Sequence, residues 1–495
     1  MAINKLLIAN RGEIACRVIL AAQEMGIRTV AVYSDADKNS LHVGLADESI
    51  YIGPSEASES YLSITKIIEA ARVSSSDAIH PGYGFLSERS EFAAACKLAK
   101  IAFVGPSAAS MEMLGSKMAA KALAVANNVP IVPGFFEADA DAPLLAREAE
   151  RMGYPILLKA SAGGGGRGMR VVRSATEFHQ EHKMAVEEAE RAFGDGAMMI
   201  ERLIENPRHV EIQFLGDKTG NIRCLFEREC SIQRRHQKLM EESPAPWPGI
   251  HSAWPQMQEA TVRLVRAAKY SGAGTCEFIV DPASGEFYFL EVNARLQVEH
   301  PVTEAVTGVD LVKWQIRIAQ GATLPVSDLG RDQIQGHAIE VRIIAEDPVR
   351  GFLPGVGKIL AWAEPKRPGI RVDSGYRAGD EISSHYDSLL AKVISHAETR
   401  PEAINRLRRA LMDFHILGVP TNIGFLLDVL DHPDFQRGEF HTGWLAIHFG
   451  SPRLPLLPEE LGLLVRIAET SNVPPLGSPA AKVARPAWQT QNSFR

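Results

Sequence analysis

Chemically versatile side chains occupy every second position of one stretch in the second half of the chain. Small or apolar residues separate Glu291, Asn293, Arg295, Gln297 and Glu299. On an extended strand this spacing puts all five side chains on one face. Asn, Gln and Glu are poor strand formers, so solubility alone does not explain the pattern.

The residue types in this stretch indicate specific chemistry. Glu and Asn two positions apart suit a hard metal ion, an arginine suits a small oxyanion, and Glu299 is a candidate general base. A fully extended face would run about 26 Å at ~3.3 Å per residue, which is too long for one small site. We therefore expect the chain to bend after Arg295. A half-buried strand with a solvated face is the alternative.

A further carboxylate precedes this stretch on a neighbouring strand. Glu277 lies in a predicted strand, and the turn 281–286 leads back toward Glu291 and Asn293. A three-residue loop would set Glu277 directly opposite Glu291. Two carboxylates so close repel each other unless a cation lies between them, so the three residues predict a magnesium site rather than a surface pair.

A glycine-rich loop lies earlier in the chain. Gly163 to Gly168 follow Lys159 at the end of an apolar strand, and another strand-like segment begins at Met169. Such a loop lets backbone N–H groups close on phosphate oxygens, and the lysine adds positive charge. The strand after the loop argues against a Rossmann turn, and the Gly-Lys-Ser/Thr of a P-loop is absent. We expect a mobile flap over nucleotide phosphates; a flexible hairpin without a ligand is the alternative.

A dense run of charge covers residues 227–238 and includes Gln233, His236 and Lys238. A solvated face is the usual interpretation of such a run. Its place in a predicted strand-to-turn region near the metal-binding hairpin favours nucleotide and anion contacts modestly. Cys230 within the run is interpreted as a structural residue rather than a reactive thiol.

Composition excludes several classes of protein. A chain of 495 residues is too long for one core. The net charge of -7 offers no basic surface for nucleic acid. No apolar run approaches the roughly 20 residues of a membrane span, and no signal peptide opens the chain, so we expect a cytoplasmic protein. Five scattered cysteines without C-x-x-C spacing indicate neither zinc nor disulfides.

Strand and helix patterns alternate through the first hundred residues. Predicted strands at 5–9 and 29–33 flank a predicted helix at 12–25, and the alternation continues to residue 104. This order indicates a doubly wound parallel sheet. The first turn lacks the glycine triplet of a dinucleotide site. The predicted fold class is α/β, with α+β character over the whole chain.

Six segments carry a family resemblance: residues 8–15, 80–88, the glycine loop, 205–211, 233–238 and 295–304. On these motifs the chain resembles the biotin carboxylases, which are ATP-grasp enzymes. The resemblance covers residues 1 to about 448. It implies that ATP phosphorylates bicarbonate to carboxyphosphate, which then carboxylates N1′ of a carrier-bound biotin.

The resemblance also implies roles for individual residues. To ATP it assigns Lys117, Lys159, Gly165, Gly166, Glu201, Arg202, Leu203, Ile204, His209, Gln233 and His236. Magnesium, or manganese, would bind Glu277, Glu291 and Asn293. Bicarbonate would lie among Lys238, Arg295, Gln297, Val298 and Glu299. Glu299 would be the base, Arg342 would hold biotin and its developing enolate, and Tyr83 would lie on the biotin side.

Two positions depart from the family pattern. Arg202, Leu203 and Ile204 stand where relatives often have Lys-Tyr-Leu, so adenine contacts there are expected to be partly backbone ones. Ile344 replaces an Asn common in relatives, close to Arg342. This second change bears on the support of the arginine that would hold biotin.

We expect three domains and a tail. They are an N-terminal domain at 1–115, an ATP-grasp domain at 116–333 with a mobile glycine-rich lid at about 131–204, a mixed α+β C-terminal domain at 334–448, and a partly disordered tail at 449–495. The tail is rich in Pro, Ser and Ala toward its end.

The resemblance implies the biotin carboxylase component of an acyl-CoA carboxylase of the acetyl-CoA or propionyl-CoA type, as in fatty acid biosynthesis. The expected partners are carboxyltransferase subunits, a second copy in a homodimer, and a separate biotin carboxyl carrier protein, since the chain has no Met-Lys-Met triplet. Nucleic acid and membranes are not expected partners. The alternatives are another ATP-grasp ligase, joining a carboxylate to an amine, and a catalytically silent nucleotide-binding scaffold.

Overall fold

Short apolar strands separated by helices fold the N-terminal hundred residues into a parallel sheet. In the computed structural model, which describes residues 2–450 except 138–139, 162–168, 236 and 326–329, the strand order is β3-β2-β1-β4-β5. The strands are β1 (Lys5–Ile8), β2 (Arg28–Ser34), β3 (Glu48–Gly53), β4 (Ala78–His80) and β5 (Ala102–Phe103). All their pairings are parallel. The doubly wound α/β fold predicted here is confirmed.

Helices cover both faces of this sheet because its strands are apolar on both sides. Leu6 and Ile8 of β1 share one core with α1 (Gly12–Glu24) and α11 (Leu311–Gln320). Leu7 between them points into a second core, which contains residues of α3 (Ile64–Val73) and α4 (Ser90–Leu98). Alternate residues of one strand thus separate two layers of helices.

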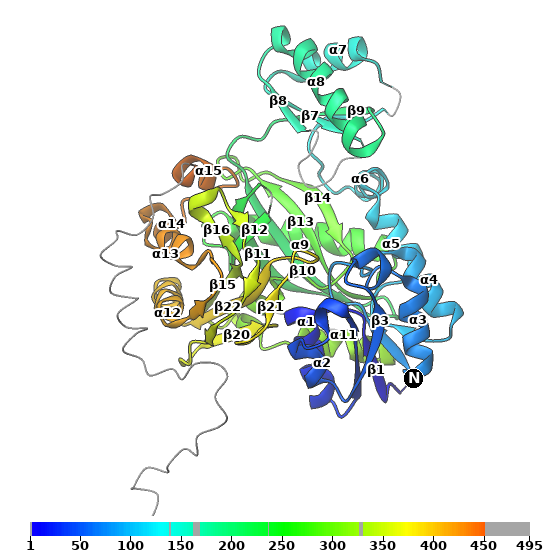
Figure 1. Ribbon diagram of the computed structural model, residues 1–495. Helices are drawn as coiled ribbons and strands as arrows, with labels where there is room; N and C mark the ends of the chain where they lie inside the picture. Colours follow the sequence, from blue (N-terminus) through cyan, green and yellow to red (C-terminus); the bar gives the residue numbers. More distant parts are fainter. Residues whose placement is uncertain (1, 138–139, 162–168, 236, 326–329, 451–495) are drawn as a thin grey trace, which may run out of the picture. The chain divides into compact units, whose positions relative to one another are not determined.

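An antiparallel sheet of eight strands forms the centre of the described chain (Figure 1). Its order is β14-β13-β10-β11-β12-β15-β22-β20. The bounds are β10 (Arg208–Gly216), β11 (Ile222–Arg234), β12 (Gln237–Ser243), β13 (Gly272–Val280), β14 (Phe287–Asn293), β15 (His337–Ile344), β20 (Ile370–Ser374) and β22 (Leu389–Ala397). The pairing of β12 with β15 makes one continuous sheet of strands on both sides of residue 333.

A smaller four-stranded sheet carries the segment where the glycine lid was predicted. We call it the lid sheet: β6 (Gly134–Phe135), β9 (Met198–Arg202), β7 (Ile156–Ala160) and β8 (Met169–Val172). It packs with α7 (Ala142–Met152) and α8 (Ala175–Phe193) around a core of its own. Figure 1 shows this group, in cyan and green, set apart from the large sheet. β7 and β8 are antiparallel, as predicted for strands on either side of the glycine loop.

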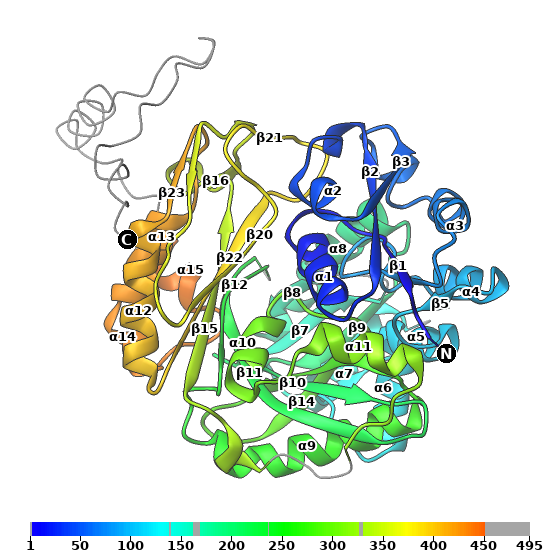
Figure 2. The same ribbon diagram turned by 90° about the horizontal axis from the view of Figure 1, so that it is seen from below.

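Helices pack along one side of the C-terminal strands (Figure 2). They are α12 (Arg400–Asp413), α13 (Ile423–Asp431), α14 (Pro433–Arg437) and α15 (Trp444–Phe449). Their shared core includes Leu239 and Met240 of β12. Within the described residues, the remaining helices of eight or more residues are α5 (Ala108–Gly115), α6 (Lys117–Ala126), α9 (Ile250–Ala267) and α10 (His300–Thr307).

Two predictions from composition concern the cysteines and membrane-spanning helices. All five cysteines are buried, and none of them is in a disulfide bond. Burial raises the pKa of the Cys230 thiol well above its ordinary value, as expected for a structural residue. Across the residues that the structure describes, no helix combines the length and apolarity needed to cross a membrane.

Candidate active site

Neighbouring strands of the large sheet place acidic residues side by side. Glu211 of β10 pairs with Glu277 of β13, which pairs in turn with Glu291 of β14. A bulge between Glu277 and Phe278 sets this register, and the turn between the two strands spans 281–286. The predicted three-residue loop was wrong, although Glu277 and Glu291 do lie opposite each other.

The Lys238 ammonium lies at the centre of a buried carboxylate cluster. Its Nζ donates to Glu211 Oε2 at 2.6 Å, Glu299 Oε1 at 2.7 Å and Glu277 Oε1 at 3.0 Å. Burial works to lower the Lys238 pKa, but the negative charge of the surrounding carboxylates raises it well above its ordinary value. Lys238 is therefore a permanent cation that holds residues of three strands and of the turn before α10 together.

Glu299 divides its two oxygens between two cations. Oε1 accepts from Lys238, and Oε2 accepts from Arg342 Nη2 at 3.0 Å. The side chain is fully buried. Burial alone would raise the Glu299 pKa, but Lys238, Arg342 and Arg228 bring it well below its ordinary value. Glu299 is thus an ionised carboxylate with a defined position.

Arg342 is fixed on β15 by a further carboxylate. Its Nε donates to Glu241 Oε1 at 2.8 Å, and Nη2 donates to the same oxygen. Burial works to lower the Arg342 pKa, but Glu241, Glu299 and Glu340 raise it. The planar guanidinium therefore keeps its charge and one orientation. Behind it, Asn422 holds the β15 backbone, since Nδ2 donates to the Arg342 carbonyl at 2.9 Å and Oδ1 accepts from Ile344 N–H at 2.9 Å.

The predicted magnesium ligands are oxygen donors in contact with other groups. Glu277 Oε1 accepts from Asn293 Nδ2 at 2.7 Å, and Oε2 faces His209 Nε2 at 2.8 Å. Burial alone would raise the Glu277 pKa, but Lys238 and His209 hold it well below its ordinary value. This ionised donor, with Glu291 opposite, suits a hard cation once the Asn293 amide turns its oxygen toward the site.

The polar stretch 291–299 bends earlier than predicted. β14 ends at Asn293, two residues before the expected bend, so the five side chains do not share one strand face. Arg295 Nη1 donates to Gln297 Oε1 at 3.0 Å, and its Nε pairs with Glu88 at 3.0 Å. Lys392 Nζ donates to the Val298 carbonyl at 2.9 Å. The bend folds the stretch back onto the sheet.

Part of the set predicted around the nucleotide lies on or beside the lid sheet, namely Lys159, Glu201, Arg202, Leu203 and Ile204. Glu201 of β9 is buried and pairs with both Lys159 and Lys121. Arg202 donates to the Tyr288 hydroxyl and lies over its ring at 5.4 Å. Leu203 donates its N–H to the Pro155 carbonyl at 3.1 Å, and the neighbouring Ile204 is half-buried. The contact between Arg202 and Tyr288 joins the lid sheet to β14.

Several predicted positions lie elsewhere or outside the described residues. Gln233 pairs with Lys238 across the β11–β12 hairpin. Tyr83 donates its hydroxyl to Glu13 of α1. Gly165, Gly166, His236 and the Lys117 side chain lie outside the described part of the chain.

The sequence did not single out four charged residues that complete the cluster. Glu211 and Arg228 are fully buried and joined by a 2.6 Å hydrogen bond. Glu241 fixes Arg342, and Glu88 pairs with Arg295. Glu211 lies two residues after His209 on β10, so the same period-two spacing could have found it. Glu241 needed the β12–β15 pairing, which no local pattern gives.

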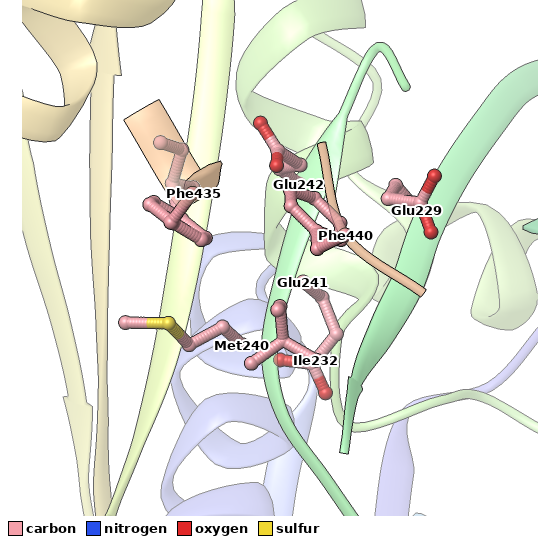
Figure 3. A pocket seen from close by; sticks show the side chains of 8 residues that line it. Glu229, Ile232, Met240, Glu241, Glu242, Phe435 and Phe440 are labelled. Atoms are coloured by element: carbon pink, nitrogen blue, oxygen red, sulfur yellow. The ribbon is translucent and has the colours of Figure 1, made fainter. Parts of the chain in front are cut away.

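A small pocket lies behind this cluster, against the C-terminal helices (Figure 3). Its lining residues are Glu229, Ile232, Met240, Glu241, Glu242, Ile339, Phe435 and Phe440. Of these, only Glu241 contacts a predicted catalytic residue, Arg342. The concentration of buried charge around Lys238 and Glu299, rather than this small pocket, marks the candidate site.

Three family models match the chain in succession. They are "Biotin carboxylase, N-terminal domain" at 2–111, "Carbamoyl-phosphate synthase L chain, ATP binding domain" at 116–327 and "Biotin carboxylase C-terminal domain" at 340–447.

Proteins of similar sequence include Biotin carboxylase 1 of Bacillus subtilis, 49% identical over 90% of this chain and 99% of that protein. The mouse mitochondrial methylcrotonoyl-CoA carboxylase subunit alpha is 49% identical over 90% of this chain. The chain spans 62% of that longer relative.

Solved structures give the same picture. A Campylobacter jejuni biotin carboxylase in complex with an ATP compound has a TM-score of 0.85 at 43% identity, over 90% of this chain and 99% of that one. The biotin carboxylase domain dimer of Hydrogenobacter thermophilus 2-oxoglutarate carboxylase, with MgADP, ADP and bicarbonate, has a TM-score of 0.84 at 43% identity, over 92% of this chain and 100% of that one.

Proposed function

The chain belongs to the biotin carboxylase family, and from that premise we propose that it carboxylates protein-bound biotin with bicarbonate and ATP. Members of this family are ATP-dependent ligases that use ATP, Mg²⁺ and biotin. The observation that carries the proposal is the position of Glu299, whose two oxygens contact Lys238 and Arg342. A base between two cations suits a reaction that joins two anions.

In the proposed reaction, bicarbonate lies among Lys238, Arg295, Gln297 and the Val298 backbone. Glu299 accepts its proton while ATP phosphorylates it. Before substrate binds, the low pKa of Glu299 makes it a weak base, so the role of base requires its pKa to rise in the complex. A bound anion takes over part of the hydrogen bonding of Lys238, which raises the proton affinity of Glu299 as the proton arrives.

In the second step, carboxyphosphate transfers its carboxyl group to N1′ of biotin, and phosphate leaves and takes up the N1′ proton. Arg342 is proposed to bind the ureido oxygen of biotin and to stabilise the enolate that develops there during this transfer. Its hydrogen bonds to Glu241 and Glu299 orient the guanidinium, and its raised pKa keeps the group charged, so a planar cation is in place to bind a developing oxyanion. Tyr83 is proposed for the biotin side. It is tied to the cluster indirectly, because its partner Glu13 pairs with Lys392, which holds the Val298 carbonyl.

The nucleotide is proposed to bind between the lid sheet and strands β10 and β11 of the large sheet. The assigned residues are Lys117, Lys159, Gly165, Gly166, Glu201, Arg202, Leu203, Ile204, His209, Gln233 and His236. Mg²⁺, held by Glu277, Glu291 and Asn293, would neutralise the phosphates. Since Lys159 pairs with Glu201 in the described structure, phosphate binding would require Lys159 to exchange that carboxylate for the nucleotide.

The proposed domain division follows the sequence expectation: 1–115, 116–333 with a lid at about 131–204, 334–448 and a tail. The ranges of the three family models support these boundaries. A homodimer, a biotin carrier protein and a carboxyltransferase are proposed partners. Similarity to a structure described as a domain dimer supports the first of these.

The final acceptor is proposed to be an acyl-CoA. Relatives include subunits named for methylcrotonoyl-CoA and propionyl-CoA, so acetyl-CoA is one member of the proposed class. Complexes assembled with candidate carboxyltransferases would identify the acceptor by the labelled carboxyl group each one transfers.

The test of the proposed function is ATP hydrolysis measured with and without bicarbonate and biotin. A biotin carboxylase should hydrolyse ATP only when bicarbonate is present, and biotin should stimulate the rate. Another ATP-grasp ligase would require an amine instead, and a silent scaffold would bind nucleotide without turnover. Bicarbonate-independent hydrolysis would therefore contradict the proposal.

A further inference from the structure

A cluster of metal-binding side chains lies among the last helices, outside the residues assigned to catalysis. His432 stands between α13 and α14, Asp434 lies in α14, and His448 lies in α15. One ligand atom from each residue lies within 4.8 Å of the others. We propose that His432, Asp434 and His448 form a binding site for Zn²⁺.

The spacing of the ligand atoms is close to that around a tetrahedral ion. Asp434 Oδ2 lies 3.7 Å from His432 Nδ1 and 3.6 Å from His448 Nε2. Zinc bonds of about 2.0–2.1 Å at tetrahedral angles separate neighbouring ligand atoms by roughly 3.3 Å. The two distances from the carboxylate oxygen thus exceed the tetrahedral spacing by only a few tenths of an ångström, and all three ligand atoms lie within 4.8 Å of one another.

The carboxylate of Asp434 is oriented for this role. Arg437 Nη2 pairs with Oδ1 at 2.5 Å, and Trp444 Nε1 donates to Oδ2 at 3.4 Å. Donors of this kind fix the orientation of metal-binding carboxylates and leave one oxygen directed at the ion. Oδ2 is the oxygen that faces the two histidines.

The imidazoles are also held in place before any ion binds. His432 packs edge-on against Trp444 with ring centroids 4.9 Å apart, and against His448 at 4.7 Å. His432 Nδ1 accepts a hydrogen bond from the Asp434 N–H at 3.2 Å. Nδ1 thus carries the lone pair that an ion requires, and zinc would replace this one hydrogen bond.

The donor set selects zinc over the cation used in catalysis. Two imidazole nitrogens and one carboxylate oxygen suit Zn²⁺, whereas Mg²⁺ prefers oxygen donors alone. Three protein ligands leave a fourth position for water. Because the ligands come from α14, from the residue that precedes it and from α15, the ion would cross-link these two helices.

Zinc titration by calorimetry on the metal-stripped full chain tests the proposal. We expect saturable binding that Asp434→Asn and His448→Gln each weaken by about 100-fold or more, since even indirect supports of a metal site are worth about 10- to 100-fold. The control His251→Gln removes an exposed histidine on α9 and should leave binding unchanged. Circular dichroism would verify that each variant is folded.

A local signal separates this site from the buried His209, Glu211 and Glu277 cluster, which could also bind zinc. Ni²⁺ bound at the proposed site should quench the fluorescence of Trp444, and Trp444→Phe should remove that quenching. Glu277→Gln should leave it unchanged. Equal zinc affinity in the parent and Asp434→Asn, or no saturable binding up to millimolar zinc, would overturn the proposal.

Discussion

Glu299 is held by two cations, and this arrangement makes its proton chemistry separable from its structural role. Glu299→Gln keeps the shape and can still accept a hydrogen bond from Lys238 or Arg342, but it cannot take up a proton. We expect bicarbonate-dependent ATP turnover to fall by about 10²- to 10⁴-fold while ATP binding persists.

Steady-state kinetics and a nucleotide-binding titration measure the two effects. The exposed Glu398→Gln serves as the matched control and should leave both unchanged. Turnover within a factor of about two of the parent would remove Glu299 from the role of base.

Glu242 contributes to the stability of the folded protein in a way that depends on pH. It accepts from Arg400 Nε at 2.7 Å and faces His337 Nε2 at 2.6 Å. Burial alone would raise its pKa, but Arg400 and His337 lower it from 4.5 to about 2. Because the folded-state pKa is depressed, the stabilisation is complete above pH 4.5 and is lost as the pH falls toward 2.

Glu242→Gln removes this dependence. The stability difference between parent and variant, from urea unfolding, should be largest near neutral pH and narrow by about 1 kcal/mol or more on going to roughly pH 3.5. A difference that stays constant over this range would show that the Glu242 pKa is not depressed in the folded protein.

At the scale of elements, the lid sheet should respond to nucleotide. Its core is separate from that of the large sheet, and Lys159 and Lys121 pair with Glu201 on its inner strand. Saturating ATP and Mg²⁺ should slow hydrogen exchange in peptides that cover β7 and β8. Peptides from β1 and β2 provide the internal control. Unchanged exchange in β7 and β8 would contradict lid closure.

Local patterns predicted elements better than they predicted geometry. Alternating apolar strands and helices at the N-terminus and the strands beside the glycine loop followed from short-range periodicity. The bulge at Glu277 and the early end of β14 at Asn293 did not, because contacts with other strands decide both. Glu241 shows the same limit, since it meets Arg342 only through the pairing of two distant strands.

At the scale of the whole molecule, the domain boundary proposed at residue 333 does not separate two independent packing units, because strands and core residues from both sides of it pack together. β12 pairs with β15 across it, and Leu239 and Met240 of β12 are buried in the core of the C-terminal helices. A chain ending at 333 would leave β12 as an unpaired edge with an exposed apolar face.

We therefore expect residues 1–333 alone to aggregate on expression, whereas residues 1–450, which pack as one unit, should remain monodisperse. Size-exclusion chromatography and ATP binding compare the two chains. A monodisperse, ATP-binding 1–333 fragment would show that the strands after residue 333 are dispensable for the fold.

Lys392 links the N-terminal region to the segment that carries Glu299, so the two regions cannot be combined freely from different relatives in a chimera. Fully buried on β22, it donates to the Val298 carbonyl beside Glu299 and pairs with Glu13 of the N-terminal domain at 3.3 Å. A chimera that takes its first hundred residues from a homologue without this glutamate would leave a buried ammonium short of one counter-charge, next to the base. Functional chimeras of these enzymes should accordingly keep Glu13 and Lys392 together.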